Sequence, residues 1–254
     1  MMGISYNTSI STNGLILHID PANVKSYPGS GTDITDLSKN LDFTTYNSGT
    51  YFNHNSANGT FEITRSTTAG SKAGGGFEAT AASSSDLAVD NFLYNDHTIS
   101  VWCKINDLAR FRDYDATETT ETNSALLVWR GYHAGFYYNS STLYYIMWSN
   151  GSTVSINTTS ISEGAWLNII GRRSSNTLEL IINNVSASGP TSVTTTTTNV
   201  NTTDIIRIGY ANSGTSNYAW YSDLDIGDVK LYNRALNDDE ISKNFEALRG
   251  RFGI

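Results

Sequence analysis

The chain has 254 residues and a formal net charge of −8, with 39% hydrophobic and only 16% charged residues. This hydrophobic content supplies a sizeable core and argues against a disordered chain. A surface that binds nucleic acid needs clustered Lys and Arg, whereas the nearest approach here is the pair Arg172-Arg173, whose side chains point to opposite faces if they lie on a strand. We therefore expect no nucleic-acid partner.

Cysteine content and the lack of long apolar runs narrow the remaining classes. The single cysteine, Cys103, excludes an intramolecular disulfide and zinc sites with several cysteines, and its apolar surroundings predict a small buried thiol. Residues 1–7 have neither the basic nor the apolar region of a signal peptide. No apolar run approaches the ~20 residues that cross a bilayer, so we expect a soluble chain with neither a signal peptide nor a transmembrane segment.

Abundant Thr, Tyr, Ile and Val, separated by Asn, Gly and Ser, predict an all-β chain. In chain order, we predict strands at residues 15–19, 51–52, 60–63, 98–106, 124–130, 136–138, 143–148, 154–156, 166–170, 178–185, 205–209 and 229–233. In the strand at 98–106, one face is apolar and consists of Ile99, Val101, Cys103 and Ile105. Residues 79–85 show no period, and the polar residues 107–123 are expected to form a long surface loop.

The last predicted strand leads into the one helix that the sequence predicts. Residues 229–233 alternate in a way that predicts a strand with one buried face. Asn237 is a favourable N-cap, and Glu240 completes an Asn-x-x-Glu form of the capping box. The apolar stripe of this helix consists of Ile241, Phe245 and Leu248. Gly250 is expected to close the helix at C′.

The two ends of the chain resemble a known family. Residues 231–236 (LYNRAL), followed by 238–241 (DDEI) and a helix, look like the end of a laminin-G-like domain of the concanavalin A-like lectin/glucanase superfamily. Residues 14–20 (GLILHID) resemble the opening of such domains, where an edge element pairs near the C-terminal strand. The terminal residues 248–254 (LRGRFGI) are similar to the ending of such domains in structural proteins of tailed phages.

The strand pattern and the resemblance imply the same architecture. Many short strands separated by turns are typical of a two-sheet sandwich. The resemblance implies an all-β, two-sheet antiparallel jelly-roll sandwich of the concanavalin A-like type with one short C-terminal helix. Because both ends of the chain carry the resemblance, we expect a single laminin-G-like domain over residues 1–254.

Hydrolases also occur in this superfamily, so the resemblance raises the question of a catalytic pair. A retaining glycosidase needs two carboxyl groups about 5–5.5 Å apart. The nearest match is Asp223, Asp225 and Asp228, but the spacing breaks the strand alternation and no Glu is present. We interpret these residues as turn residues entering the last strand, and we predict no catalytic residues and no enzymatic activity. The four histidines are His18, His54, His97 and His133, and they lie in no motif. A catalytic triad can also be assembled from distant segments, so this spacing alone does not exclude one.

Metal binding is a separate question, because many laminin-G-like domains bind Ca²⁺. Calcium takes oxygen ligands, which Asp107, Asp113 and Asp115, or the segment 223–228, could supply. Solvated acidic loops are the alternative interpretation of these residues. No ligand pattern is specific enough to carry over, so we predict no cofactor and no metal site and leave calcium open.

Aromatic residues are the most informative feature for binding, since Phe, Trp and Tyr make up 11% of the chain. Amphipathic rings in loops rich in Gly, Ser and Asn commonly form binding surfaces, and neighbouring Asn and Asp can bind sugar hydroxyls. The alternative is that the rings fill the sandwich or pack against a neighbouring subunit. The predicted ligand-binding residues are Tyr132, His133, Tyr218, Trp220 and Tyr221.

Three functions follow from these observations. The first is a non-enzymatic structural and binding module on the surface of a phage virion, decorating a head, neck or tail or associated with a fibre. Its expected partners are other virion proteins and host-surface glycans, and a homo-oligomer fits a chain that must attach by its own surface. The second is a glycoside hydrolase acting on envelope polysaccharide. The third is a bacterial adhesin module, which we would expect to carry an export signal or further domains.

Overall fold

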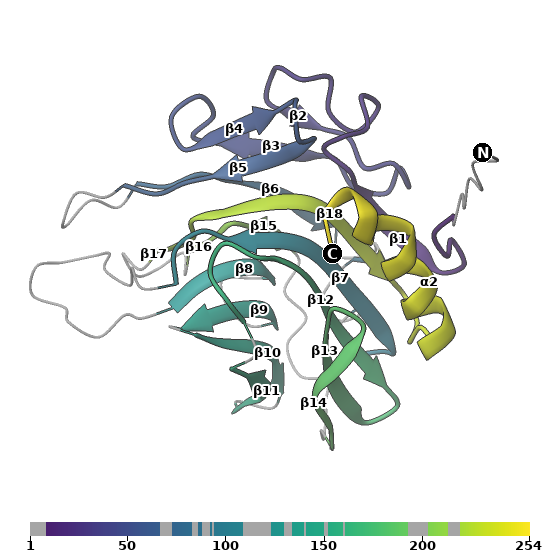
Figure 1. Cartoon of the computed structure of the whole chain (residues 1–254). Coiled ribbons are helices and arrows are strands. Elements are labelled where there is room, and N and C mark those ends of the chain that lie inside the picture. Colours follow the sequence, from purple (N-terminus) through teal and green to yellow (C-terminus); the bar gives the residue numbers. More distant parts are fainter. Residues whose placement is uncertain are drawn as a thin grey trace, which may run out of the picture.

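The computed structural model describes residues 9–66, 73–82, 86–87, 92, 94–108, 123–129, 134–139, 141–149, 152–159, 161–192, 203–212 and 219–254. In this part of the chain, two antiparallel β-sheets form a sandwich, and a helix near the C-terminus lies against one of them (Figure 1). The predicted all-β, jelly-roll-like sandwich with one short C-terminal helix is confirmed. No helix among the described residues is long and apolar enough to cross a membrane.

The first sheet has the strand order β14-β13-β12-β7-β18-β5-β4, and β1 also pairs with β18. Its strands are β1 (Leu15–Ile19), β4 (Phe52–Asn55), β5 (Thr60–Ile63), β7 (His97–Ile105), β12 (Trp166–Ser174), β13 (Thr177–Ile182), β14 (Val185–Ser192) and β18 (Leu224–Tyr232). The antiparallel pairing of β1 with β18 is the arrangement that the resemblance implied for the two ends of the chain. The strand predicted at 178–185 ends earlier, because Asn183 and Asn184 have positive φ and turn the chain into β14.

The second sheet has the order β11-β10-β9-β8-β15-β6-β3-β2, and a separate two-stranded sheet joins β16 to β17. Their strands are β2 (Asp33–Ile34), β3 (Phe43–Tyr46), β6 (Gly76–Ala82), β8 (Asn123–Trp129), β9 (Ala134–Asn139), β10 (Thr142–Ser149), β11 (Ser152–Thr158), β15 (Thr203–Ile208), β16 (Tyr210–Asn212) and β17 (Ala219–Tyr221). Strand β6 overlaps the first part of residues 79–85, in which the sequence shows no hydrophobic period. Its inner face, which carries Phe77, Ala79 and Ala81, is buried in the core.

The inner faces of both sheets share one hydrophobic core. Side chains alternate between the two faces of a strand, so every second residue of each strand points into this core. The predicted inner face of β7 belongs to this core, and Cys103 is fully buried there as expected. The core also explains the paired tyrosines of the second sheet. Tyr138 and Tyr145 point inward and are fully buried, whereas their neighbours Tyr137 and Tyr144 are only half-buried.

The prediction that strand β18 has only one buried face is wrong. All nine of its residues are buried, including Asp228 and Lys230. The inner face lies in the main core, while the outer face is covered by helix α2, by Phe252 after it and by Ser11, whose carbonyl accepts a hydrogen bond from the Tyr232 hydroxyl. A cover of this kind comes from distant segments, so the alternation within the strand does not reveal it.

The helix α2 (Asp238–Leu248) begins as predicted. Its capping box is complete: the Asn237 side chain accepts a hydrogen bond from the Glu240 amide at 2.9 Å, and the Glu240 carboxylate accepts one from the Asn237 amide at 3.1 Å. Its other end differs from the prediction. Gly250 lies within the 3₁₀ turn η1 (Arg249–Arg251), and Gly253, with φ +73°, adopts the left-handed conformation instead.

Candidate functional site

Two tyrosines stack on the outer face of the second sheet. Tyr137 on β9 lies directly opposite Tyr144 on β10 in the strand register, so both side chains point to the same face. Their ring centroids are 4.6 Å apart and the rings are 3° from parallel. Burial, followed by the neighbouring Tyr144, raises the pKa of Tyr137 to about 12, so its hydroxyl stays a neutral hydrogen-bond donor at physiological pH.

Trp220 joins this pair from a distant part of the chain. The hairpin of β16 and β17 lies over β8, where Trp220 packs against Ala125, Val128 and Ala211. The centroid of Trp220 is 5.7 Å from that of Tyr137. We call the three half-buried rings of Tyr137, Tyr144 and Trp220 the aromatic platform.

The platform ends at a polar residue. The strand register places Asn157 on β11 directly opposite Tyr144, and Asn157 is exposed. The face of the Tyr144 ring that turns away from Tyr137 therefore lies toward an accessible carboxamide. An aromatic face beside an amide can bind a ligand that is apolar on one side and rich in hydroxyl groups around its edge.

A second group of rings on the same outer face is mainly structural. Tyr210 stacks with Tyr46 at 4.8 Å and with Tyr221 at 6.1 Å, and both Tyr210 and Tyr221 are buried. The Tyr210 hydroxyl donates to the Glu78 carboxylate at 2.6 Å, and the Arg207 guanidinium donates to the same oxygen at 2.9 Å. These bonds fix the Tyr210 ring at the start of β16, and Tyr221 at the end of β17 stacks on that ring, so Tyr221 supports the position of the β16–β17 hairpin.

The predicted binding residues thus have different outcomes. Trp220 is half-buried within the platform, whereas Tyr221 is buried beside it. Tyr132, His133 and Tyr218 lie outside the described residues. Sequence reasoning did not separate Tyr137 and Tyr144 from their buried neighbours, although the period-two alternation of Phe136 with Tyr138 contained that signal.

The comparisons with known proteins agree with this architecture. The laminin-G-type family model of the concanavalin A-like lectin/glucanases superfamily matches residues 74–242, more than half of the chain. The chain belongs to this superfamily. The comparison with curated proteins found no match. The phage-type part of the resemblance is not tested by the family model and stays a prediction.

Solved structures with a similar fold include a sialidase and botulinum neurotoxins. Trypanosoma rangeli sialidase has a TM-score of 0.62 at 15% identity, over 96% of this chain and 34% of that chain. Botulinum neurotoxin type C, whose cell entry is described as dependent on two ganglioside molecules, has a TM-score of 0.65 at 17% identity, over 92% of this chain and 51% of that chain. The binding domain of botulinum neurotoxin serotype D/C has a TM-score of 0.63 at 16% identity, over 92% and 52%. This chain therefore spans about a third to a half of these proteins, and identities this low show the fold alone.

The carboxylates that could serve a superfamily hydrolase have other partners. Asp225 and Asp228 lie within β18, which corrects our interpretation of them as turn residues. The two oxygens of Asp225 contact Lys104 Nζ at 2.6 Å and Asn106 Nδ2 at 3.0 Å. Burial raises the pKa of Asp223, while Asn106 and Arg65 act in the opposite direction. Asp225 is thus held as an internal counter-ion of Lys104, which is a structural role.

Another group of titratable residues lies between β1 and β18. Among the described residues, the ligand atoms of His18, Asp20 and Asp228 lie within 4.8 Å of one another. Asp228 is already bonded to Lys230 and, at 3.0 Å, to His18, and Asp20 is bonded to Arg251 at 2.7 Å. Since each carboxylate here faces an internal cation, a divalent ion would compete with two positive side chains. Of the acidic residues that could supply calcium ligands, Asp107 lies 3.6 Å from Arg65, and Asp113 and Asp115 lie outside the described residues.

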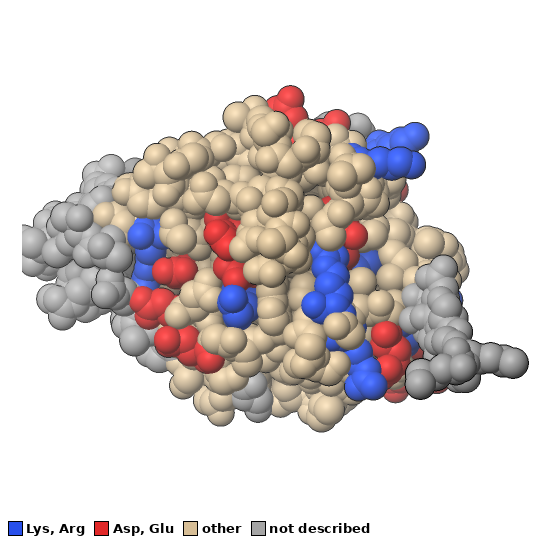
Figure 2. All heavy atoms as spheres, turned by 45° about the horizontal axis from the view of Figure 1, so that its top comes forward, with Lys and Arg blue, Asp and Glu red and all other residues tan. Residues whose placement is uncertain are grey.

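Charges are dispersed on the face of the molecule that Figure 2 shows. Figure 2 shows one face of the molecule, on which acidic and basic side chains lie next to each other in small groups between uncharged residues. Such a surface suits hydrogen bonding to uncharged polar groups better than long-range attraction of a highly charged polymer.

Proposed function

We propose that this chain is a non-catalytic carbohydrate-binding module whose aromatic platform stacks on sugar rings. The observation that carries the proposal is the exposed end of the platform, where the ring face of Tyr144 lies beside the carboxamide of Asn157. Sugars present C–H groups on their faces and hydroxyl groups at their edges, which matches a ring next to an amide. The superfamily includes lectins, and the toxin of similar fold interacts with gangliosides, which supports this class of ligand.

Replacing Tyr144 with Ala should weaken glycan binding about tenfold, because a stacking contact worth about 1.4 kcal/mol is lost. The Asn157→Ala variant should weaken binding by a smaller factor, because a surface hydrogen bond contributes about 0.5–1.5 kcal/mol. A glycan array identifies the ligands of the unmodified chain, and calorimetry with the strongest of them measures the two variants.

Tyr46→Ala is the matched control for these variants. Tyr46 is a partly exposed tyrosine on the same face, but β3 lies four strands from β9, or roughly 19 Å. Its loss should leave the affinity unchanged. Equal affinities for Tyr144→Ala and the unmodified chain would reject the platform as the site. Release of reducing sugar from the bound glycan, lost in Asp223→Asn, would replace the non-catalytic proposal with the hydrolase alternative.

We further propose that the module acts on the surface of a phage virion, where it contacts other virion proteins and host-surface glycans. The resemblance of residues 248–254 to phage structural proteins and the weakly charged polar surface support this placement. The chain should appear in purified particles by mass spectrometry, and labelled antibodies should locate it on their outside by electron microscopy. Its absence from washed particles would contradict the placement without affecting the glycan-binding proposal.

A further inference from the structure

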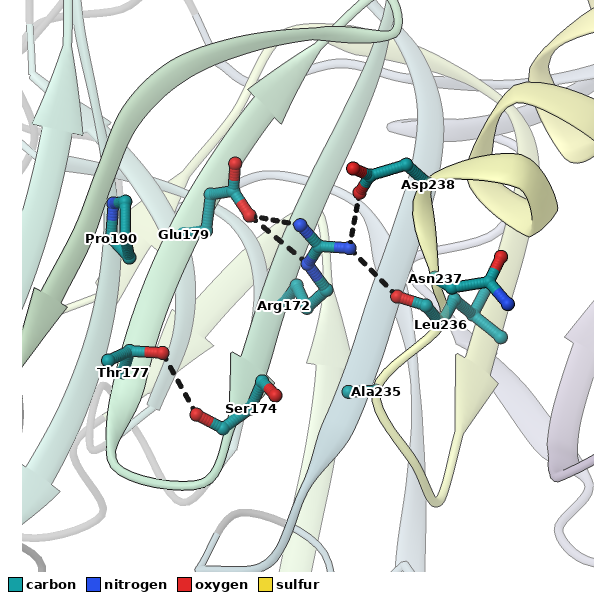
Figure 3. A pocket seen from close by; sticks show the side chains of 9 residues that line it. All are labelled: Arg172, Ser174, Thr177, Glu179, Pro190, Ala235, Leu236, Asn237 and Asp238. Carbon is teal, nitrogen blue, oxygen red and sulfur yellow. Dashed lines mark hydrogen bonds and ion pairs between the residues drawn. The ribbon is translucent and has the colours of Figure 1, made fainter.

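A hollow lies on the outer face of the first sheet, on the side of the sandwich away from the aromatic platform. It is formed between the β12–β13 hairpin and the residues that precede helix α2 (Figure 3). Its volume is about 480 Å³, within the range of about 300–1,000 Å³ that small-molecule sites occupy. The lining residues are Arg172, Ser174, Thr177, Glu179, Pro190, Ala235, Leu236, Asn237 and Asp238. The aromatic platform belongs to the opposite sheet, so the two features lie on opposite faces of the sandwich.

Arg172 is held rigidly at the centre of this hollow. Its Nε and Nη2 donate to one oxygen of Glu179 at 3.1 and 2.5 Å, and its Nη1 donates to the Leu236 carbonyl at 2.9 Å and to Asp238 at 2.7 Å. Figure 3 shows Arg172 between Glu179 on one side and Leu236 and Asp238 on the other. Four of its five N–H groups are therefore used, and the planar guanidinium has its position fixed from two elements.

Polar groups with capacity for a ligand surround this fixed arginine. One N–H of Arg172 and the second oxygen of Asp238 have no bond to the described residues, and the side chain of Asp238 is 86% exposed. The Asn237 side chain uses its oxygen as the helix cap, which leaves its amide N–H groups available. The Ser174 hydroxyl adds a group that both donates and accepts. Donors and acceptors thus alternate around the hollow, as a polyhydroxylated ligand requires.

The remaining lining is apolar and small. Pro190 and Ala235 supply aliphatic surface, and Leu236 is a buried apolar residue of the lining. A sugar ring can place its C–H groups on such a surface while its hydroxyl groups reach the polar rim.

The charges restrict the class of ligand. One guanidinium and two carboxylates leave the hollow with one net negative charge, and the guanidinium is already paired with both carboxylates. An anionic sugar would meet the free oxygen of Asp238 without gaining an unpaired cation. We propose that this hollow is a second glycan-binding site, which takes a neutral sugar and rejects a sialylated one.

Amide chemical shifts test the hollow directly. Uniformly labelled protein is titrated with three probes: maltotriose, N,N′-diacetylchitobiose and 3′-sialyllactose. We expect at least one neutral probe to shift the amides of Ser174, Thr177 and Asn237, with a Kd on the order of 1 mM. Sialyllactose should leave these amides in place. No shift with either neutral probe, or an equal shift with sialyllactose, would overturn the assignment.

Two variants separate this site from the aromatic platform. Ser174→Trp fills the hollow from an exposed position. It should weaken the binding of the neutral probe at least tenfold without a change in the thermal unfolding temperature. Asp238→Asn should bring the affinity for sialyllactose closer to that for the neutral probe. Tyr144→Ala should leave the shifts at Ser174 and Asn237 unchanged, so that failure of the platform and failure of the hollow give different results. Undiminished binding in Ser174→Trp would place the sugar elsewhere and reject the hollow.

Discussion

Replacing Asp228 with Asn should lower the free energy of unfolding by about 3–5 kcal/mol, because it leaves a buried ammonium without its counter-charge. Asp228 and Lys230 are 0% and 1% exposed and are bonded to each other on the outer face of β18. The Nε2 atom of His18 on β1 donates the second hydrogen bond to Asp228, at 3.0 Å. Urea unfolding of the variant, followed by circular dichroism, measures the loss.

The double variant Asp228→Asn/Lys230→Met is the control for this prediction. Removing both charges exchanges a buried ion pair for groups of similar volume, which is often neutral for stability. The double variant should therefore recover most of the loss. A loss below about 1 kcal/mol in the single variant would show that Lys230 does not depend on Asp228 for its burial.

The same ion pair makes stability depend on acid. Burial alone would raise the pKa of Asp228, but Lys230 and His18 hold that pKa below its ordinary value. A carboxylate with a lowered pKa contributes its full stability above the unfolded value of about 3.9 and loses it as the pH falls through the folded value. The unmodified chain should therefore lose stability below about pH 4, and the double variant should lack this part of the loss.

This buried pair also shows what the sequence could and could not reveal. Local signals were reliable: the alternation in β7 and the capping box of Asn237 and Glu240 both appear as predicted. The prediction of one buried face for residues 229–233 left Lys230 on the other face, because the strand pattern contains no information about what covers that face. That cover comes from helix α2, from Phe252 after it and from Ser11, which is more than 200 residues away in the sequence.

The candidate site had the same limit. Aromatic content predicted a binding surface, and Trp220 lies in the aromatic platform that we propose as one. However, its neighbours depend on the β16–β17 hairpin lying over β8, which is a long-range contact. The hollow around Arg172 was not predicted, because Arg172, Pro190 and Asp238 come together only when the helix packs on the sheet.

Replacing Trp102 with Ala should also cost about 3–5 kcal/mol of unfolding free energy, the range for removing a large buried aromatic side chain. Trp102 is 1% exposed and lies between two rings from the end of the chain: Phe245 at 5.5 Å and Phe252 at 4.5 Å, both nearly parallel to it. The bulge in β18 fits this packing, because a Cβ at Gly227 would lie 2.3 Å from a ring carbon of Phe252. Thermal and urea unfolding measure the loss.

Trp166→Ala is the matched control, since Trp166 packs on Phe252 in the same cluster but is only half-buried. Its replacement should cost about 1–2 kcal/mol, because less apolar area returns to water. Equal losses of unfolding free energy in the two variants would show that the position of Trp102 between the rings of Phe245 and Phe252 adds no stability beyond that of a half-buried tryptophan.

The position of Trp102 connects this stability to binding. It fixes Phe245 on helix α2, whose first residues form one wall of the hollow around Arg172. Under conditions where Trp102→Ala remains folded, hydrogen exchange in α2 should accelerate, because the helix loses the apolar contact of Phe245 with Trp102. The neutral sugar probe should then bind more weakly at Ser174 and Asn237, while the affinity of the aromatic platform stays unchanged because it lies on the opposite sheet. A parallel loss at both sites would mean that the two sheets do not hold their binding surfaces independently.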